Sequence, residues 1–287
     1  MVDFKEKYAL VTGATNGIGF VTALELARLG ITVMIVGRNE ARCLEAVKRI
    51  ADETGNPTIH YMVADLSDMR AVRLLAQAYR AQFNQLDILV NNVGAIFMKR
   101  LESVDGLEMT FALNHMSYFV LTQDLLPLIQ HSAERDAEFG ARIVNVSSGA
   151  HVLPVNWKDL QFQRSYSGFR AYSQSKHMNV LFTYELAKRL AGTGITVNAL
   201  HPGAVATNFM RDNGWFSKAL SSVAKVFQKS PQEGAQTSIY LATSPNVHNV
   251  SGKYFDNCAE RKSFPATYDP KAWARLWEIS QQIADRI

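Results

Sequence analysis

The chain has 287 residues, of which 47% are hydrophobic, enough for one large α/β domain or two smaller ones. Its 30 Lys and Arg residues against 26 Asp and Glu give a net charge of +4, and the basic residues are spread along the chain, so nucleic-acid binding is not indicated. The 2 cysteines, Cys43 and Cys258, are distant in sequence and form neither a disulfide framework nor a metal signature, which fits a reducing, cytoplasmic compartment and predicts no metal site.

The start of the chain predicts neither a secretory signal nor a membrane anchor. "MVDFKEKYALVTG" passes from charged residues directly into a short apolar run. No window approaches the ~18 uninterrupted apolar residues that a transmembrane helix requires. We therefore expect a soluble protein without an integral membrane segment.

Apolar runs of strand length alternate with helical patterns along the chain. Runs rich in Val and Ile predict strands at 8–13, 32–37, 58–65, 87–92, 142–148 and 195–203. Apolar periodicity predicts helices at 17–29, 39–53, 68–83, about 105–130, about 169–191 and 231–243, and a closing helix in "DPKAWARLWEISQQIADRI". This alternation indicates an α/β fold with a doubly wound parallel sheet and helices on both faces. Because no linker or short repeat interrupts it, we expect a single domain over residues 1–287.

Two segments, 150–168 and 204–230, break the alternation and follow strands at their carboxyl ends, where open α/β sheets bind ligands. The aromatic residues are Trp157, Phe162 and Tyr166 in the first segment, Phe169 directly after it, and Phe209, Trp215 and Phe216 in the second segment. These residues are candidate walls and lid of an apolar substrate pocket. Alternatively, they pack the loops onto the body or form a subunit contact.

The first predicted strand runs into the glycine-rich turn "TGATNGIG", which contains Gly13, Gly17 and Gly19. Glycine lets the backbone turn sharply and approach a pyrophosphate closely, while the following helix presents free N–H groups and a positive dipole end. Glycines in such turns often serve only to end one element and begin the next, without binding a ligand. Here the turn follows a strand and precedes a helix, which favours dinucleotide binding.

The end of the second strand predicts which dinucleotide binds. An acidic residue there would accept hydrogen bonds from the adenosine ribose, but this chain has Gly37 followed by Arg38. A guanidinium can form a planar, charge-assisted pair with a 2′-phosphate, so NADP(H) is the predicted cofactor. The alternative is a solvated surface arginine. Glu40 falls at the start of the next helix, where it suits the helix dipole.

The stretch "YSQSK" sets Tyr172 and Lys176 one turn apart on a predicted helix. A phenol with a pKa near ~10 is a poor acid-base catalyst at neutral pH, and a neighbouring ammonium would stabilise the phenolate and lower that pKa. The same pair occurs by chance on helix surfaces. Its chemical significance therefore depends on what lies nearby.

"RIVNVSSGA" gives a buried strand whose carboxyl end carries Ser147 and Ser148. The Ser148 hydroxyl could hydrogen-bond a substrate carbonyl and stabilise the charge that develops on its oxygen, whereas Ser147 fits ordinary capping or turn chemistry. Asn114, in "FALNHMSY", is a polar amide in an apolar helix. It either holds a water in a proton path or faces solvent.

These motifs together resemble the short-chain dehydrogenase/reductase family over nearly the whole chain. The resemblance is carried by "TGATNGIG", "NNVG" (91–94), Asn114, "VSS", "YSQSK" and "HPGAVAT" (201–207), in this order and at these intervals. "ALNHMSYFVLT", "ELAKRL" and "SGKYFDNC" are similar to the retinol-dehydrogenase-like and WW-domain-oxidoreductase-like branch. The resemblance implies a Rossmann fold with about seven strands and, independently of Arg38, an NADP(H) preference.

The resemblance also implies residue roles. Tyr172 would be the general acid or base, Lys176 would lower its pKa and hold the nicotinamide ribose, Ser148 would polarise the carbonyl, and Asn114 would position a water. The implied cofactor contacts are Gly13, Asn16, Gly17, Ile18, Gly19, Arg38, Asp65, Leu66, Asn91, Gly94, Tyr172, Lys176, Pro202, Gly203, Val205 and Thr207. His115 and His201 are assigned to structure.

The resulting functional prediction is an NADP(H)-dependent oxidoreductase that interconverts a ketone or aldehyde and its alcohol on a fairly hydrophobic small molecule. Reduction of a conjugated double bond and a catalytically silent cofactor-binding regulator are the alternatives. Val93 replaces the family's usual Ala in "NNVG", a change expected to leave backbone contacts intact, and the missing N-terminal anchor argues against a retinoid substrate. The family often forms dimers or tetramers through its two long helices, so a homodimer or homotetramer is possible.

Overall fold

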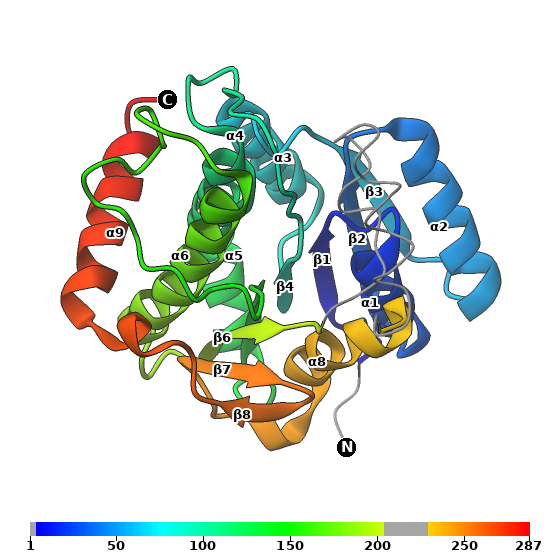
Figure 1. The fold of residues 1–287 in the computed structure, drawn as a ribbon. Coiled ribbons are helices and arrows are strands. Elements are labelled where there is room, and N and C mark those ends of the chain that lie inside the picture. The colour runs from blue at the N-terminus through cyan, green and yellow to red at the C-terminus, as the bar shows by residue number, and fades with distance from the viewer. Residues whose placement is uncertain (1–3, 204–228) are drawn as a thin grey trace.

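One eight-stranded sheet organises the computed structural model, which describes residues 4–203 and 229–287 (Figure 1). Its strands are β1 (Tyr8–Thr12), β2 (Thr32–Gly37), β3 (Ile59–Val63), β4 (Ile88–Asn91), β5 (Ala141–Val146), β6 (Ile195–His201), β7 (Lys253–Asp256) and β8 (Ala259–Arg261). The spatial order is β3-β2-β1-β4-β5-β6-β7-β8, and only the β7–β8 pair is antiparallel. The strand order reverses between β1 and β4, which creates the switch point where such sheets bind ligands. The predicted Rossmann fold is confirmed.

Helices cover both faces of the sheet, as predicted. They are α1 (Gly17–Arg28), α2 (Glu40–Thr54), α3 (Met69–Gln82), α4 (Met109–Phe111), α5 (Ser117–Arg135), α6 (Gly168–Arg189), α8 (Pro231–Thr243) and α9 (Pro270–Ala284). Helices α1, α2 and α8 lie on one face, and α3, α5 and α6 lie on the other (Figure 1). The predicted helix boundaries agree to within a few residues, except in the region of 105–130.

The core divides into two clusters because successive strand residues point to opposite faces of the sheet. Leu10 and Met34 pack under α3, α5 and α6, whereas their neighbours Val11 and Ile35 pack under α1, α2 and α8. All four side chains are buried. Both faces are therefore apolar, which explains the near-continuous apolar runs in the sequence.

Helix α9 packs along α6, on the outer side of the molecule (Figure 1). Trp277 stacks on Phe182 with ring centroids 6.1 Å apart and meets Phe119 edge-on at 5.1 Å. Deeper in the contact, the His115 Nε2 atom and the Ser280 hydroxyl are 2.8 Å apart. The predicted closing helix thus covers aromatic residues of the two long helices that were considered for a subunit contact.

Two features were absent from the sequence-based expectation. The short antiparallel hairpin of β7 and β8 extends the sheet beyond β6. The predicted long helix at 105–130 is divided into α4, a π-helical turn at Ala112–Met116 and α5. Within the described residues, no helix combines the length and apolarity needed to cross a membrane.

Candidate active site

A cleft of about 730 Å3 lies at the carboxyl ends of the strands, and the glycine-rich turn after β1 forms one wall. Gly13 and Gly17 have positive φ values of 65° and 58°. A Cβ on Gly19 would lie 2.5 Å from Asn92 Nδ2 and 2.6 Å from the Gly13 carbonyl oxygen. The turn is therefore packed so tightly that only glycine fits.

The amino end of α1 opens into the same cleft. Asn16, its N-cap residue, makes no side-chain capping bond, and the first turn of the helix carries no acidic residue. Asn16, Gly17, Ile18 and Gly19 all line the cleft, as predicted. Backbone N–H groups and a positive dipole end that are not used by a cap form a suitable cradle for a pyrophosphate.

The end of β4 forms the adjoining wall and is tied to β1. The Asn92 and Val93 backbone N–H groups donate to Thr12 Oγ1 at 2.9 and 3.1 Å, and Asn92 Nδ2 donates to the Thr12 carbonyl at 2.7 Å. The Val93 carbonyl accepts from the Tyr118 hydroxyl at 2.7 Å. The backbone contacts at Val93 are therefore regular despite its larger side chain.

The Asn91 side chain, predicted to line the cofactor, is fully buried and does not face the cleft. Its Nδ2 donates to Thr122 Oγ1 at 3.0 Å and to Asn145 Oδ1 at 2.9 Å, which holds it among the strands and α5. The neighbouring residue Asn92 lines the cleft instead. Consecutive strand residues point in opposite directions, which explains the difference between the two side chains. The cofactor contact of Asn91 stays a prediction.

Basic residues stand at the end of the cleft next to β2. Arg38 is exposed and lines the cleft, and Arg42, on the first turn of α2, lines it as well. Asn39 caps α2 by accepting a hydrogen bond from the Arg42 backbone N–H at 3.0 Å. Arg42 was not predicted, because it lies inside α2 while Arg38 precedes the N-cap, so no helical spacing joins the two residues. Glu40 begins α2, as expected.

The two cofactor contacts predicted after β3 differ in their surroundings. Leu66 is buried and lines the cleft. Asp65 is exposed, and its Oδ1 accepts hydrogen bonds from the Ser67 backbone N–H at 2.9 Å and hydroxyl at 2.8 Å. Asp65 is not among the lining residues, so its contact with the cofactor, to which the family resemblance gives the adenine ring, stays a prediction.

Ser148, Tyr172 and Lys176 meet at the floor of the cleft. Ser148 follows β5, and its hydroxyl hydrogen-bonds the Tyr172 phenol from α6. Lys176 Nζ lies 5.8 Å from the centre of the Tyr172 ring and donates to the Val146 carbonyl at 2.9 Å. The geometry therefore brings together the three groups on which the predicted chemistry depends.

Burial has the largest effect on the acidities of this group. It raises the pKa of Tyr172 to about 12, against an opposing effect of the Ser148 hydrogen bond, and it lowers the pKa of Lys176 to about 7. Burial penalises the phenolate and the ammonium alike, so it moves both pKa values away from the charged forms. The lowering of the Tyr172 pKa by the Lys176 ammonium stays a prediction.

Asn114 lies in the π-helical turn and is fully buried, so it does not face solvent. Its Oδ1 accepts from the Ala95 N–H, and its Nδ2 donates to the Ala95 carbonyl and to Ser175 Oγ, each at 2.9 Å. A Cβ on Gly94 would lie 3.2 Å from Lys176 Nζ and 3.4 Å from Asn114 Oδ1. Gly94 thus leaves Asn114 and Lys176 next to each other; the water-holding role of Asn114 stays a prediction.

The remaining predicted residues divide into three groups. Ser147 Oγ donates to the Lys176 carbonyl at 2.8 Å, which fits its structural assignment. Pro202, Gly203 and also His201 line the cleft, and the Gly203 N–H donates to His201 Nδ1 at 3.3 Å. Val205 and Thr207 lie outside the described residues.

Comparison with known proteins agrees with this arrangement. The sequence model of the family described as short chain dehydrogenase matches residues 7–215. The chain belongs to the short-chain dehydrogenase family. Human retinol dehydrogenase 14 is 40% identical over 96% of this chain and 85% of its own length, and human polyprenol dehydrogenase is 38% identical over 96% and 84%. These relatives identify the retinol-dehydrogenase-like branch of the family.

Solved structures of short-chain dehydrogenases share the fold. The NADP complex of RhlG from Pseudomonas aeruginosa has a TM-score of 0.70 and 30% identity, over 89% of this chain and 97% of that chain. An uncharacterised protein from Mycobacterium paratuberculosis has a TM-score of 0.77 and 29% identity, over 99% and 95%. The cleft identified above is therefore the active-site candidate of a nicotinamide-dependent oxidoreductase fold.

The aromatic residues of segment 150–168 pack this short-chain dehydrogenase's loop onto its body and do not line the cleft. The Trp157 ring lies 4.6 Å from the guanidinium of Arg275 on α9, and Phe162 is buried against Tyr166. The Tyr166 hydroxyl donates to the Phe97 carbonyl at 2.7 Å. These three residues therefore pack against the body of the protein, and their part in a substrate pocket stays a prediction. Phe169 is 54% exposed, and Phe209, Trp215 and Phe216 lie outside the described residues.

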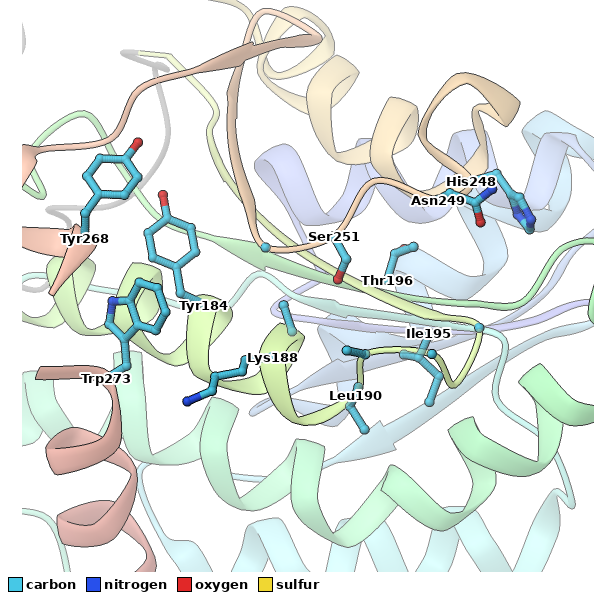
Figure 2. Close-up of a pocket in the computed structure, with 15 residues that line it drawn as sticks. Tyr184, Lys188, Leu190, Ile195, Thr196, His248, Asn249, Ser251, Tyr268 and Trp273 are labelled. Carbon is cyan, nitrogen blue, oxygen red and sulfur yellow. The ribbon is translucent and has the colours of Figure 1, made fainter. Parts of the chain in front are cut away.

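A second hollow, of about 620 Å3, lies at the opposite, amino ends of the strands (Figure 2). Figure 2 shows Tyr184, Tyr268 and Trp273 gathered at one side and His248 at the other. The Tyr184 hydroxyl and Ser263 Oγ are 2.7 Å apart, and Trp273 Nε1 donates to the Thr267 carbonyl at 2.6 Å. The polar atoms of Tyr184 and Trp273 are therefore paired within the protein, whereas His248 Nδ1 has no hydrogen-bond partner among the described residues.

Among residues 4–203 and 229–287, no group of three or more His, Cys, Asp or Glu side chains is arranged to hold a metal ion.

Proposed function

We propose that this short-chain dehydrogenase is an NADP(H)-dependent oxidoreductase that interconverts a ketone or aldehyde and its alcohol on a fairly hydrophobic small molecule. The observation that carries the proposal is a single cleft with two complementary ends. One end holds the Ser148–Tyr172 hydrogen bond beside Lys176, and the other holds the glycine turn, the uncapped start of α1 and two arginines. The first end suits acid-base chemistry, and the second suits a dinucleotide phosphate.

The residues along the cleft fit a dinucleotide. The tight contact at Gly19 brings the backbone against the wall where a pyrophosphate would lie, and Gly94 keeps the space over Lys176 clear. Arg38 and Arg42 would pair with a 2′-phosphate, which is absent from NAD(H). Bound in this cleft, NADPH supplies a hydride for reduction of a carbonyl carbon.

The chain's own groups would supply the remaining chemistry. Ser148 would donate a hydrogen bond to the carbonyl oxygen and stabilise the negative charge that develops there. Tyr172 would give its proton to that oxygen, completing the alcohol. Its raised pKa, caused by burial, keeps the phenol protonated at neutral pH, as a proton donor requires. In alcohol oxidation the same phenol would act as base, after losing its proton with the help of the Lys176 charge.

Apolar groups support the hydrophobic character of the substrate. Val93, Ala95, Leu113, Val146 and Ala150 line the cleft near the reactive group. The names of two similar proteins refer to retinol and polyprenol, both long apolar alcohols. An apolar carbonyl or alcohol with a short polar end fits this setting. We also propose that the protein works in the cytoplasm, where NADPH is available.

The direct test is NADPH consumption with a panel of lipophilic aldehydes and ketones, with identification of products. We expect an alcohol as product, faster turnover with NADPH than with NADH, and loss of turnover in Tyr172→Phe. A product with a reduced carbon–carbon double bond and an intact carbonyl would favour double-bond reduction. NADPH binding without turnover of any compound of either class would favour a silent regulator.

A further inference from the structure

The backbone carbonyl of Ser148 is held by an unusual set of donors. It accepts from the His151 backbone N–H at 3.2 Å and from the Tyr254 hydroxyl of β7 at 3.3 Å. The His151 Nδ1 atom lies 2.6 Å from the same oxygen. Because a carbonyl oxygen can only accept, this imidazole contact is a hydrogen bond only when Nδ1 carries the proton.

A second contact fixes that proton position. The Phe264 backbone N–H, in the segment before α9, donates to His151 Nε2 at 2.9 Å. A backbone N–H can only donate, so Nε2 must be the accepting nitrogen and Nδ1 the protonated one. His151 is only 5% exposed, and burial lowers its pKa, so the neutral ring is favoured. Phe264 thus selects the tautomer that binds Ser148.

The turn that contains His151 is also fastened to α6 beside the catalytic pair. Ser173, which follows Tyr172, donates through its hydroxyl to the Ala150 carbonyl. His177, which follows Lys176, lies with Nδ1 2.9 Å from the His151 carbonyl and donates to it. Motion of this turn relative to α6 is therefore opposed at two points.

These contacts bear on the orientation of the reactive hydroxyl. The Ala150 backbone N–H donates to Ser148 Oγ at 3.1 Å, so that lone pair is occupied and the hydroxyl proton is free to point toward Tyr172 or a substrate oxygen. Accepting a hydrogen bond also makes a hydroxyl a better donor. The direction of the Ser148 hydroxyl thus depends on the position of the turn 148–151, which the His151 side chain holds through its hydrogen bond to the Ser148 carbonyl.

We propose that His151, as its neutral Nδ1–H tautomer, is a positioning residue that holds the Ser148 hydroxyl in the geometry needed for carbonyl polarisation. The effect is transmitted from Phe264 through the imidazole to the Ser148 backbone. Its catalytic consequence rests on the proposed function. His151 is absent from the residues that line the cleft, so it would act through Ser148 and not by direct contact with substrate or cofactor.

Two substitutions separate the two nitrogens of His151. In His151→Asn, the side-chain NH2 can occupy the place of Nδ1 and donate to Ser148, but the bond from Phe264 is lost. In His151→Gln, the amide oxygen can occupy the place of Nε2 and accept from Phe264, but nothing replaces the donor to Ser148. We expect His151→Gln to lower kcat about 10- to 100-fold, as a small misplacement of a catalytic group does. His151→Asn should retain kcat to within about threefold, even though it loses the bond from Phe264.

The controls distinguish positioning from simple loss of structure. His151→Gln should leave NADPH affinity and the melting temperature close to those of the wild type. His115→Gln, at another buried histidine bonded through Nε2, should leave kcat unchanged. The proposal is overturned if His151→Gln keeps wild-type kcat, or if both His151 variants lose activity equally and in step with their melting temperatures.

A readout independent of turnover is long-range 1H–15N NMR of the histidine rings at neutral pH, with the His151 signal assigned by its absence from His151→Asn. A protonated Nδ1 supports the assignment, and a protonated Nε2 overturns it. If the wild type turns over no carbonyl compound, the proposed function fails, whereas this spectrum still tests the tautomer of His151.

Discussion

The two hollows at opposite ends of the strands are similar in size but differ in what lines them. The cleft at the carboxyl ends measures about 730 Å3 and the hollow at the amino ends about 620 Å3. The cleft is lined by glycines, an uncapped helix start and the Ser148–Tyr172–Lys176 group. At the amino-end hollow, the polar atoms of Tyr184 and Trp273 are paired, while His248 Nδ1 has no partner among the described residues. Size therefore does not identify the site, whereas the combination of a glycine turn, a helix start and the Ser148–Tyr172–Lys176 group does.

Helix direction explains part of this difference. Helix α1 begins at the cleft, so its positive dipole end faces a ligand there. Helix α6 ends beside the amino-end hollow, with Lys188 and Arg189 in its last turn. The negative end of α6 makes the hollow a poor place for a pyrophosphate.

The largest effect is expected from a comparison of two Tyr→Phe substitutions on α6, one at each end of the helix. Tyr172→Phe removes the phenol at the cleft and should lower kcat about 1,000-fold, within the range found for acid-base groups, with little change in melting temperature. Tyr184→Phe removes the phenol at the other hollow, which is bonded to Ser263, and should cost about 1 kcal/mol of stability with kcat unchanged. Steady-state kinetics and thermal unfolding of both variants provide the test. Similar activities in the two would remove Tyr172 from the mechanism.

A pair of glycine substitutions tests the backbone at each end. In Gly19→Ala, the new methyl would clash with Asn92 and the Gly13 carbonyl, so we expect kcat/KM for NADPH to fall about 100-fold. Gly192, at the amino-end hollow, has φ of 81° and open space around its Cα, so Gly192→Ala should cost about 1 kcal/mol of stability through backbone strain alone. Fluorescence titration with NADPH measures the affinities. Equal NADPH affinity in Gly19→Ala and Gly192→Ala would contradict the cradle assignment.

Arg38→Ala should lower the preference for NADPH over NADH by at least about tenfold, or about 1.4 kcal/mol, because it removes a charged partner of the 2′-phosphate. Arg28→Ala is the matched control, since Arg28 is an exposed arginine paired with Glu25 within α1. The ratio of kcat/KM for the two cofactors is the measurement. An unchanged ratio in Arg38→Ala would reject the assignment of this residue, and a change in Arg28→Ala would point to a general charge effect.

The last prediction concerns the stability of the cofactor-free protein as pH changes. The pKa of Lys176 is lowered from 10.5 to about 7, so between these values the unfolded chain holds a proton that the folded chain has lost. Stability therefore rises with pH in this window, by up to about 1.4 kcal/mol per pH unit. Lys176→Met lacks this titration, so the free energy of unfolding of the wild type should increase relative to that of the variant as the pH rises above 7. Denaturant unfolding of both proteins from pH 6 to 9 measures the difference, and a constant difference would contradict the shift.

Local patterns were sufficient to predict much of the site. The glycine turn, the ends of the strands and the Tyr172–Lys176 spacing depend on neighbouring residues, so the sequence alone places them on the correct elements. The family resemblance then associated Ser148 with that pair, although it lies 24 positions before Tyr172 in the sequence. In the structure the Ser148 hydroxyl hydrogen-bonds the Tyr172 phenol.

Features that depend on three-dimensional surroundings could not be predicted. Whether the side chain of Asn91 or that of Asn92 lines the cleft depends on the direction in which each points from the end of β4. The directions in which the pKa values of Tyr172 and Lys176 shift depend on burial. His151 belongs to no spacing motif, because its partners Phe264 and Tyr254 come from distant parts of the chain. The π-helical turn at Asn114 and the β7–β8 hairpin likewise lack a local signature.

The packing of α9 has a practical consequence for expression work. Trp277 and Ser280 cover Phe119, Phe182 and His115, so removal of α9 by truncation would expose an apolar surface on α5 and α6 to solvent. Such a truncated protein should aggregate during purification even though it retains Ser148, Tyr172 and Lys176.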